Sequence, residues 1–154
     1  MYKPNLAEAY QDFINHLPDS GDVVLLILKG HLLIEKQVDL LIQNRLPKPD
    51  ALKLDDLTAH QKICLANALV SDTRGSVDSW LWPAVIKLNK LRNDIAHKLS
   101  ASGIEDRMTH LAELASQTTN PKDIRGDFES TLLTIYIEIH HRIEELNMSD
   151  FVSN

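Results

Sequence analysis

The segment at residues 23–34, VVLLILKGHLLI, constrains the fold most, because any helix that it forms is apolar on nearly all sides. Such a helix has to be covered by other elements, so residues 22–45 are predicted to form a central buried helix. Pro47 and Pro49 follow directly and cannot continue a helix, which places its end near Arg45.

Five further segments are predicted to be helical. Asn5 and Thr58 are each followed three residues later by Glu or Gln, which is the spacing of a capping box at a helix start. The last segment carries an apolar stripe at helical spacing, and no convincing strand-like alternation appears anywhere. The five segments are residues 5–16, 58–70, 79–99, 104–116 and one after Asn120, whose stripe is Phe128, Leu132, Ile135, Ile139, Ile143 and Leu146.

Loops and caps separate these segments. The polar stretch at residues 71–79 is predicted to be a connecting loop. Pro83 is then expected in the first turn of the next helix, where proline is tolerated. Asn120 is expected to cap the last helix, with Pro121 at its first position.

These elements predict an all-α fold, an antiparallel bundle of four main helices with one or two short helices attached. A chain of 154 residues is most simply one domain, here residues 1–154 with a core over about residues 21–146. The low counts of Gly (5) and Pro (6) also favour helices over a turn-rich sheet protein.

Charge and composition limit the classes of function. A net charge of −6 argues against broad, non-specific DNA binding but leaves room for a small basic site. The one cysteine, Cys64, allows no internal disulfide, no signal peptide is recognisable, and no apolar run approaches the ~20 residues that span a bilayer. We therefore expect a cytoplasmic protein without a membrane segment.

The stretch KLNKLRNDIAHKLS, residues 87–100, carries the most informative polar residues. On a helical wheel Arg92 falls inside the apolar stripe, where an unpaired charge is costly. It has to reach out of the core edge, find a carboxylate such as Glu35 or Glu138, or serve a ligand. The stripe itself consists of Leu81, Ala84, Val85, Leu88, Leu91, Ile95 and Leu99.

The opposite side of the same helix mixes large apolar and neutral polar groups, where a solvated face would carry Lys and Glu. This composition suits a second packing surface, against either another helix or another subunit. In the simpler interpretation these residues have no chemistry, and His97 only complements the helix dipole. The face consists of Trp82, Ile86, Asn89, Asn93 and His97.

Residues 92–97, RNDIAH, resemble the motif of the HEPN superfamily, an arginine, a polar residue, three further residues and a histidine on a late helix of a small bundle. A similar layout occurs in mannitol-operon-repressor-like proteins. The first resemblance implies a metal-independent endoribonuclease of a toxin–antitoxin or phage-defence system, acting on RNA as a homodimer with a composite site. It implies no cofactor and no metal, and an antitoxin protein as a possible partner.

The resemblance also implies roles for individual residues. His97 acts as general acid or base, since an imidazole ionises near neutral pH, and Arg92 binds the scissile phosphate. Asn93 orients the phosphate or the histidine, and Asp94 has a supporting role. Lys87, Lys90 and Lys98 form a small basic patch that suits RNA, and the predicted dimer interface is Trp82, Ile86 and Asn89.

Two features depart from the nuclease pattern. Some family toxins carry a tyrosine two positions after the histidine, where this chain has Leu99, and no aromatic cluster for stacking bases is evident. The alternative function is a non-catalytic helical dimer that acts as a transcriptional regulator or interaction module. A metal site is not expected, because the histidines lack ligand spacing, and His31 is expected to be a hydrogen-bonded core residue or to line the cleft.

Overall fold

The computed structural model describes residues 5–19, 21–70, 75–97, 103–116 and 124–152. Over these residues the chain forms six α-helices, two short 3-10 turns and no strand, which confirms the all-α prediction. The helices are α1 (Leu6–His16), α2 (Val23–Arg45), α3 (Ala59–Leu69), α4 (Gly75–His97), α5 (Ile104–Ser116) and α6 (Ile124–Val152), and the turns are η1 (Pro49–Ala51) and η2 (Leu54–Asp56).

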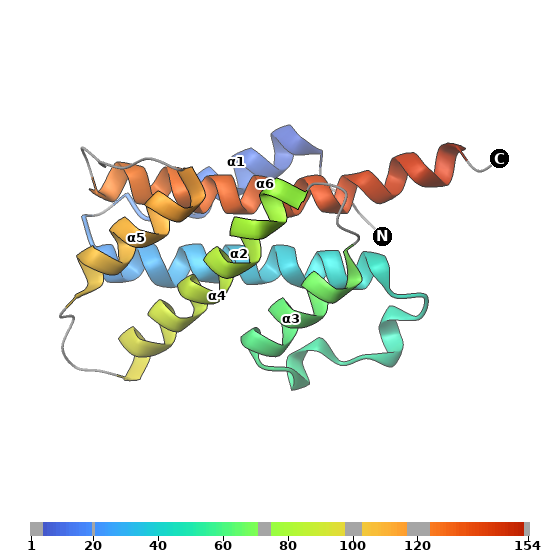
Figure 1. The fold of residues 1–154 in the computed structure, drawn as a ribbon, viewed down its shortest axis with the longest axis horizontal. Helices are drawn as coiled ribbons and strands as arrows, with labels where there is room; N and C mark the ends of the chain where they lie inside the picture. The colour runs from blue at the N-terminus through green and yellow to red at the C-terminus, as the bar shows by residue number, and fades with distance from the viewer. Residues whose placement is uncertain (1–4, 20, 71–74, 98–102, 117–123, 153–154) are drawn as a thin grey trace.

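Helix α2 lies at the centre of the fold, as its sequence predicts. It lies beside α6, and α4 crosses the pair on the near side in Figure 1, with α3 and α5 on either side of that crossing. Three helices are long and three are short, where the sequence predicted four main ones. The buried positions of α2 occur all round its middle: Leu26, Ile27, Gly30, His31, Leu33, Ile34, Gln37, Val38, Leu41 and Ile42.

A close contact between α2 and α6 depends on Gly30. A Cβ atom built on Gly30 would lie 2.5 Å from Leu132 Cδ1, which is closer than atoms of this kind approach. The missing side chain therefore leaves room for Leu132 where α6 packs on α2, although glycine lowers helix propensity by about 1 kcal/mol.

The predicted helix starts at Asn5 and Thr58 are confirmed as capping boxes. Asn5 accepts from the Glu8 backbone N–H at 2.9 Å while Glu8 accepts from the Asn5 backbone, and Thr58 pairs with Gln61 in the same reciprocal way. The stripe of α6 is confirmed for Phe128, Leu132, Ile135, Ile139 and Ile143, which are buried, while the side chain of Leu146 lies outside the described part of the chain.

The start of α4 differs from the prediction. The helix begins at Gly75, so residues 75–79 are helical rather than part of a loop, and Pro83 lies inside the helix rather than in its first turn. Proline there has no N–H to donate to the carbonyl of Ser79, but the burial of Leu81 and Trp82 beside it favours helix on both sides. The remaining expectations for residues 71–74 and for Asn120 and Pro121 lie outside the described residues.

All six helices contribute to one hydrophobic core, from Phe13 of α1 through Ile63 of α3 and Met108 of α5 to Ile143 of α6. Within the described part of the chain, no helix combines the length and the hydropathy that crossing a membrane requires.

Candidate functional site

The core stripe of α4 orients the motif residues. Leu81, Ala84, Val85, Leu88 and Leu91 are buried and Ile95 is partly buried, as predicted, while Leu99 lies outside the described residues. Helix α4 contacts α2, α3, α5 and α6, and its exposed positions include Ile86, Lys87, Lys90 and His97.

Arg92 lies at the edge of the core and is half-buried. Its guanidinium donates from Nη1 to Asn93 Oδ1 at 3.1 Å, and none of the ion pairs that join described residues includes it. The two carboxylates proposed as its partners are engaged elsewhere, since Glu35 pairs with Lys62 and Glu138 pairs with Arg142. The guanidinium of Arg92 is therefore positioned by the side-chain amide of Asn93 and not by a carboxylate.

His97 is the last residue of α4 and is exposed. It lies four residues after Asn93, so the two side chains are neighbours on one face of the helix. Ile86, 37% exposed, belongs to the same face of the wheel, two turns before Asn93 and three turns before His97. The arrangement leaves a histidine and an asparagine accessible beside an apolar side chain, while Lys98 lies outside the described residues.

Two of the three residues predicted for a dimer interface are buried within the chain itself. Trp82 is 2% exposed and Asn89 is 5% exposed, because other helices of the same chain cover this side of α4. Asn89 Oδ1 lies 3.0 Å from His31 Nε2 of α2. The wheel identified the second packing surface correctly, but the partner of Trp82 and Asn89 is another helix of this subunit rather than another subunit.

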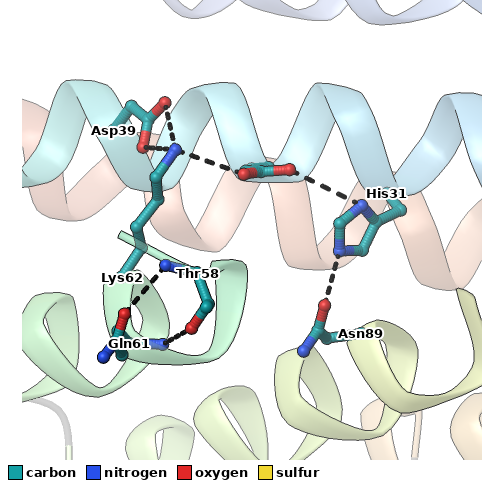
Figure 2. Close-up of polar contacts among 7 residues, drawn as sticks. His31, Asp39, Thr58, Gln61, Lys62 and Asn89 are labelled. Carbon is teal, nitrogen blue, oxygen red and sulfur yellow. Dashed lines mark hydrogen bonds and ion pairs between the residues drawn. The ribbon is translucent and has the colours of Figure 1, made fainter. Parts of the chain in front are cut away.

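A chain of buried polar contacts runs behind the motif helix (Figure 2). From Asn89 it passes to His31, whose Nδ1 lies 3.8 Å from a carboxylate oxygen of Glu35. Glu35 and Asp39 of α2 then both receive the ammonium of Lys62 from α3, at 3.2 and 3.1 Å. These contacts fix α3 and α4 against α2, and His31 is the hydrogen-bonded core histidine that the sequence predicted.

The protonation states of His31, Lys62 and Asp39 follow from their burial and from the charged groups beside them. Burial lowers the pKa of His31, and the nearby charge of Arg92 lowers it further, against the raising effects of Glu35 and Asn89. His31 is therefore neutral at pH 7, and its Nε2–H donates to Asn89. Burial also acts to lower the pKa of Lys62, but the hydrogen bonds and charges of Asp39 and Glu35 outweigh it, and the pKa is raised.

Asp39 completes the cluster. Burial raises the pKa of its carboxyl group, and this effect exceeds the lowering by the hydrogen bond and charge of Lys62. A carboxylate in this position depends on the lysine for its charge, so the lysine stays protonated and the two acids share it.

A groove of about 560 Å³ lies between α4 and α5, on the other edge of the motif helix. Two of the lysines predicted to bind RNA, Lys87 and Lys90, line it together with Asp94. Helix α5 adds Arg107 and His110, and the Arg107 guanidinium binds Asp94 at 2.7 Å. Sequence reasoning missed the two α5 residues, because a single arginine on a polar helix gives no signal until its neighbour is known.

A groove of similar size, about 510 Å³, lies between α1, α2 and α6. Its charged lining is Glu8, Asp12 and Lys36, so negative charge prevails there, and it does not suit an anion. Among the described residues, no group of three or more His, Cys, Asp or Glu side chains is arranged to hold a metal ion.

Comparison with known proteins identifies no relative, since no protein-family model, no curated protein and no solved structure matches the chain. The function is therefore inferred from the residues of this chain.

Proposed function

We propose that the chain is a metal-independent endoribonuclease that acts as a homodimer, with Arg92 and His97 of both subunits lining one cleft. The observation that carries this proposal is the state of Arg92. It is half-buried, held by Asn93, and paired with no carboxylate among the described residues, and an exposed histidine follows five residues later on the same helix. An arginine held in this way retains its charge and donors for an anion.

The proposed reaction needs only these groups and RNA. One His97 takes the proton of the ribose 2′-hydroxyl, and the 2′-oxygen forms a bond to phosphorus while the bond from phosphorus to the 5′-oxygen breaks. The leaving 5′-oxygen receives a proton from the partner subunit's His97. Arg92 stabilises the charge on the other phosphate oxygens, and Asn93 holds its guanidinium. The products are a 2′,3′-cyclic phosphate and a 5′-hydroxyl end.

The resemblance of residues 92–97 to the HEPN pattern supports this reaction, and it implies a subunit contact beside the motif. Since Trp82 and Asn89 are buried within the subunit, the proposed contact is formed by Ile86 and the residues around Asn93 and His97. An unregulated nuclease stops growth, so a role as toxin or phage-defence effector, restrained by an antitoxin protein, is the corresponding cellular function.

A second candidate is a non-catalytic helical dimer that acts as a regulator or interaction module. Ile86 favours it as well, because an exposed apolar side chain beside neutral polar groups suits a protein contact without chemistry. The net charge of −6 agrees with this candidate, since an acidic protein repels nucleic acid away from its basic site.

Cleavage of a mixed-sequence RNA by purified protein in EDTA separates the two candidates. We expect wild type to produce 2′,3′-cyclic phosphate ends, and His97→Ala to lower the rate by about 10²–10⁴-fold. His16→Ala is the matched control, because His16 is also an exposed histidine in the last turn of a helix. Intact RNA with wild type, or equal rates for the His97 and His16 variants, would refute the nuclease.

The composite cleft has its own test. The mechanism uses His97 of both subunits, so a dimer of one wild-type and one His97→Ala subunit is expected to be as inactive as the His97→Ala homodimer. Loss of cleavage in dimers shown by mass to be mixed supports a cleft shared between subunits. If such mixed dimers still cleave RNA, the two histidines do not act together across a subunit contact.

A further inference from the structure

We propose that the groove between α4 and α5 is the binding path for the single-stranded RNA backbone, and that Arg107 and His110 of α5 belong to it. This inference rests on the proposed function, since it assigns the route by which substrate reaches His97. The groove, defined as Lys87, Lys90, Leu91, Asp94, Arg107, His110 and Leu111, has a volume of about 560 Å³.

The charge of the groove is opposite to that of the protein as a whole. Lys87, Lys90 and Arg107 supply three permanent positive charges against the one negative charge of Asp94, on a chain with a net charge of −6. His110 Nδ1 lies 3.6 Å from a carboxylate oxygen of Glu113, which does not line the groove. A local positive potential on an acidic protein attracts a polyanion to this groove.

The groove leads toward His97. Lys90 and His97 are seven residues apart, which places them about 20° apart on the wheel and about 10 Å apart along α4. The distance from Lys87 to His97 along the helix is about 15 Å, enough for about four phosphates of a stacked strand at about 3.4 Å each. A strand in the groove therefore reaches His97 at one end.

Arg107 is the residue of the groove that we expect to exchange its ion-pair partner when RNA binds. Its guanidinium is bound to Asp94 at 2.7 Å, and both side chains are about one-third exposed, at 34% and 30%. An ion pair with that exposure contributes little to stability, so a phosphate can compete for the arginine. Asp94, predicted as a supporting residue, thus acts by holding Arg107 at the groove when no strand is present.

Single-stranded RNA fits this groove better than duplex DNA. The groove lies between two helices that pack against each other, and its floor is the apolar pair Leu91 and Leu111, both buried. With these leucines covered, the accessible lining is mainly the charged side chains, which suit the phosphates of one flexible strand. A duplex presents phosphates on a broad convex surface and cannot enter between the helices.

Fluorescence anisotropy with a labelled 20-nucleotide mixed-sequence RNA tests the proposal in the His97→Ala background, which prevents cleavage. The groove variants are Lys87→Gln/Lys90→Gln and Arg107→Gln. The matched control is Lys48→Gln/Lys53→Gln, which removes two exposed lysines beside η1 and η2, at the far end of the molecule from α5 (Figure 1). Thermal unfolding confirms that each variant is folded.

The salt dependence gives the expected numbers. Three phosphate contacts predict a log–log slope of about −2 for a single strand, so binding weakens about 20-fold between 50 and 200 mM salt. The double lysine variant retains one contact and should weaken only about 2.5-fold over the same range, from a lower affinity at the start. Asp94→Asn frees Arg107 and should tighten binding by up to about fivefold.

The outcomes separate this inference from the proposed function. Weak, salt-insensitive binding by the groove variants, with normal binding by the control, supports the groove even if wild type never cleaves RNA. Cleavage by wild type together with unchanged RNA binding by the groove variants overturns the groove alone. Equal affinity for duplex DNA in competition overturns the assignment to single-stranded RNA.

Discussion

The substitution Lys62→Met tests the buried polar chain behind the motif helix most sharply. Lys62 is 5% exposed and its ammonium serves two carboxylates, Glu35 and Asp39, at 3.2 and 3.1 Å. Methionine has a similar length and no charge, so it fills the space but leaves two acids without their cation. Breaking a fully buried ion pair in this way costs about 3–5 kcal/mol.

The structure sets a smaller value here. The side chains of Glu35 and Asp39 are 26% and 27% exposed, so water can solvate both carboxylates after Lys62 is removed and offset part of the loss. We expect the free energy of unfolding to fall by about 2–3 kcal/mol at pH 7.5. The measurement is urea unfolding followed by the fluorescence of Trp80 and Trp82, with Lys29→Met, an exposed lysine of α2, as the control that should change by less than about 0.5 kcal/mol.

The pH dependence of the stability loss caused by Lys62→Met provides a second test. The pKa of Asp39 is already raised by burial and rises further without Lys62. A raised carboxyl pKa means that the charged acid opposes folding above its unfolded pKa near 3.8, and that protonation relieves this as pH falls. The deficit of Lys62→Met should therefore shrink toward pH 4. A deficit below about 0.5 kcal/mol at pH 7.5, or one that grows in acid, would refute this reasoning.

Three further predictions concern other buried groups. Gly30→Ala should lower the free energy of unfolding by about 1 kcal/mol in urea, because overpacking against Leu132 exceeds the gain in helix propensity. Arg142→Met removes a 1% exposed arginine from Asp78 and should cost about 3 kcal/mol, measured by thermal unfolding; a loss under 1 kcal/mol contradicts this. Burial raises the pKa of Tyr136 to about 12, above its unfolded value, so the stability it contributes is lost between about pH 10 and 12. Ultraviolet absorbance should show this late ionisation, and Tyr136→Phe should remove it.

The helices were predictable from sequence because their signals are local. The stripe of α6 and the capping boxes at Asn5 and Thr58 depend on residues three or four positions apart, which interact within one helix. The start of α4 was not, because its first turns combine polar residues with a proline, and the packing of Trp82 and Leu81 against other helices outweighs both.

The candidate site was predictable in part for the same reason. Arg92, Asn93 and His97 lie on one helix, and the bond from Arg92 to Asn93 joins adjacent residues. The contacts from His31 to Asn89 and from Lys62 to Glu35 join residues 58 and 27 positions apart, and no local pattern predicts which helices meet. Arg107 belongs to the same class, since only the packing of α5 on α4 brings it to Asp94.

The helical wheel also explains why the dimer interface predicted at Trp82, Ile86 and Asn89 was only partly correct. A pattern of Trp82, Asn89 and Ile86 on one side of α4 predicts a second packing surface, but it cannot distinguish a helix of the same subunit from a second copy. Burial assigns the first two to the subunit and leaves Ile86 exposed beside Asn93 and His97.

Growth after induction, with total RNA from each culture on a gel, tests the central claim most directly. Wild type is compared with His97→Ala and with His16→Ala, the control that removes an equally exposed helix-terminal histidine. We expect wild type and the His16 variant to arrest growth with discrete RNA fragments, and the His97 variant to grow with intact RNA. Equal growth and intact RNA in all three cultures would contradict the nuclease and leave the motif helix as a packing element of a non-catalytic dimer.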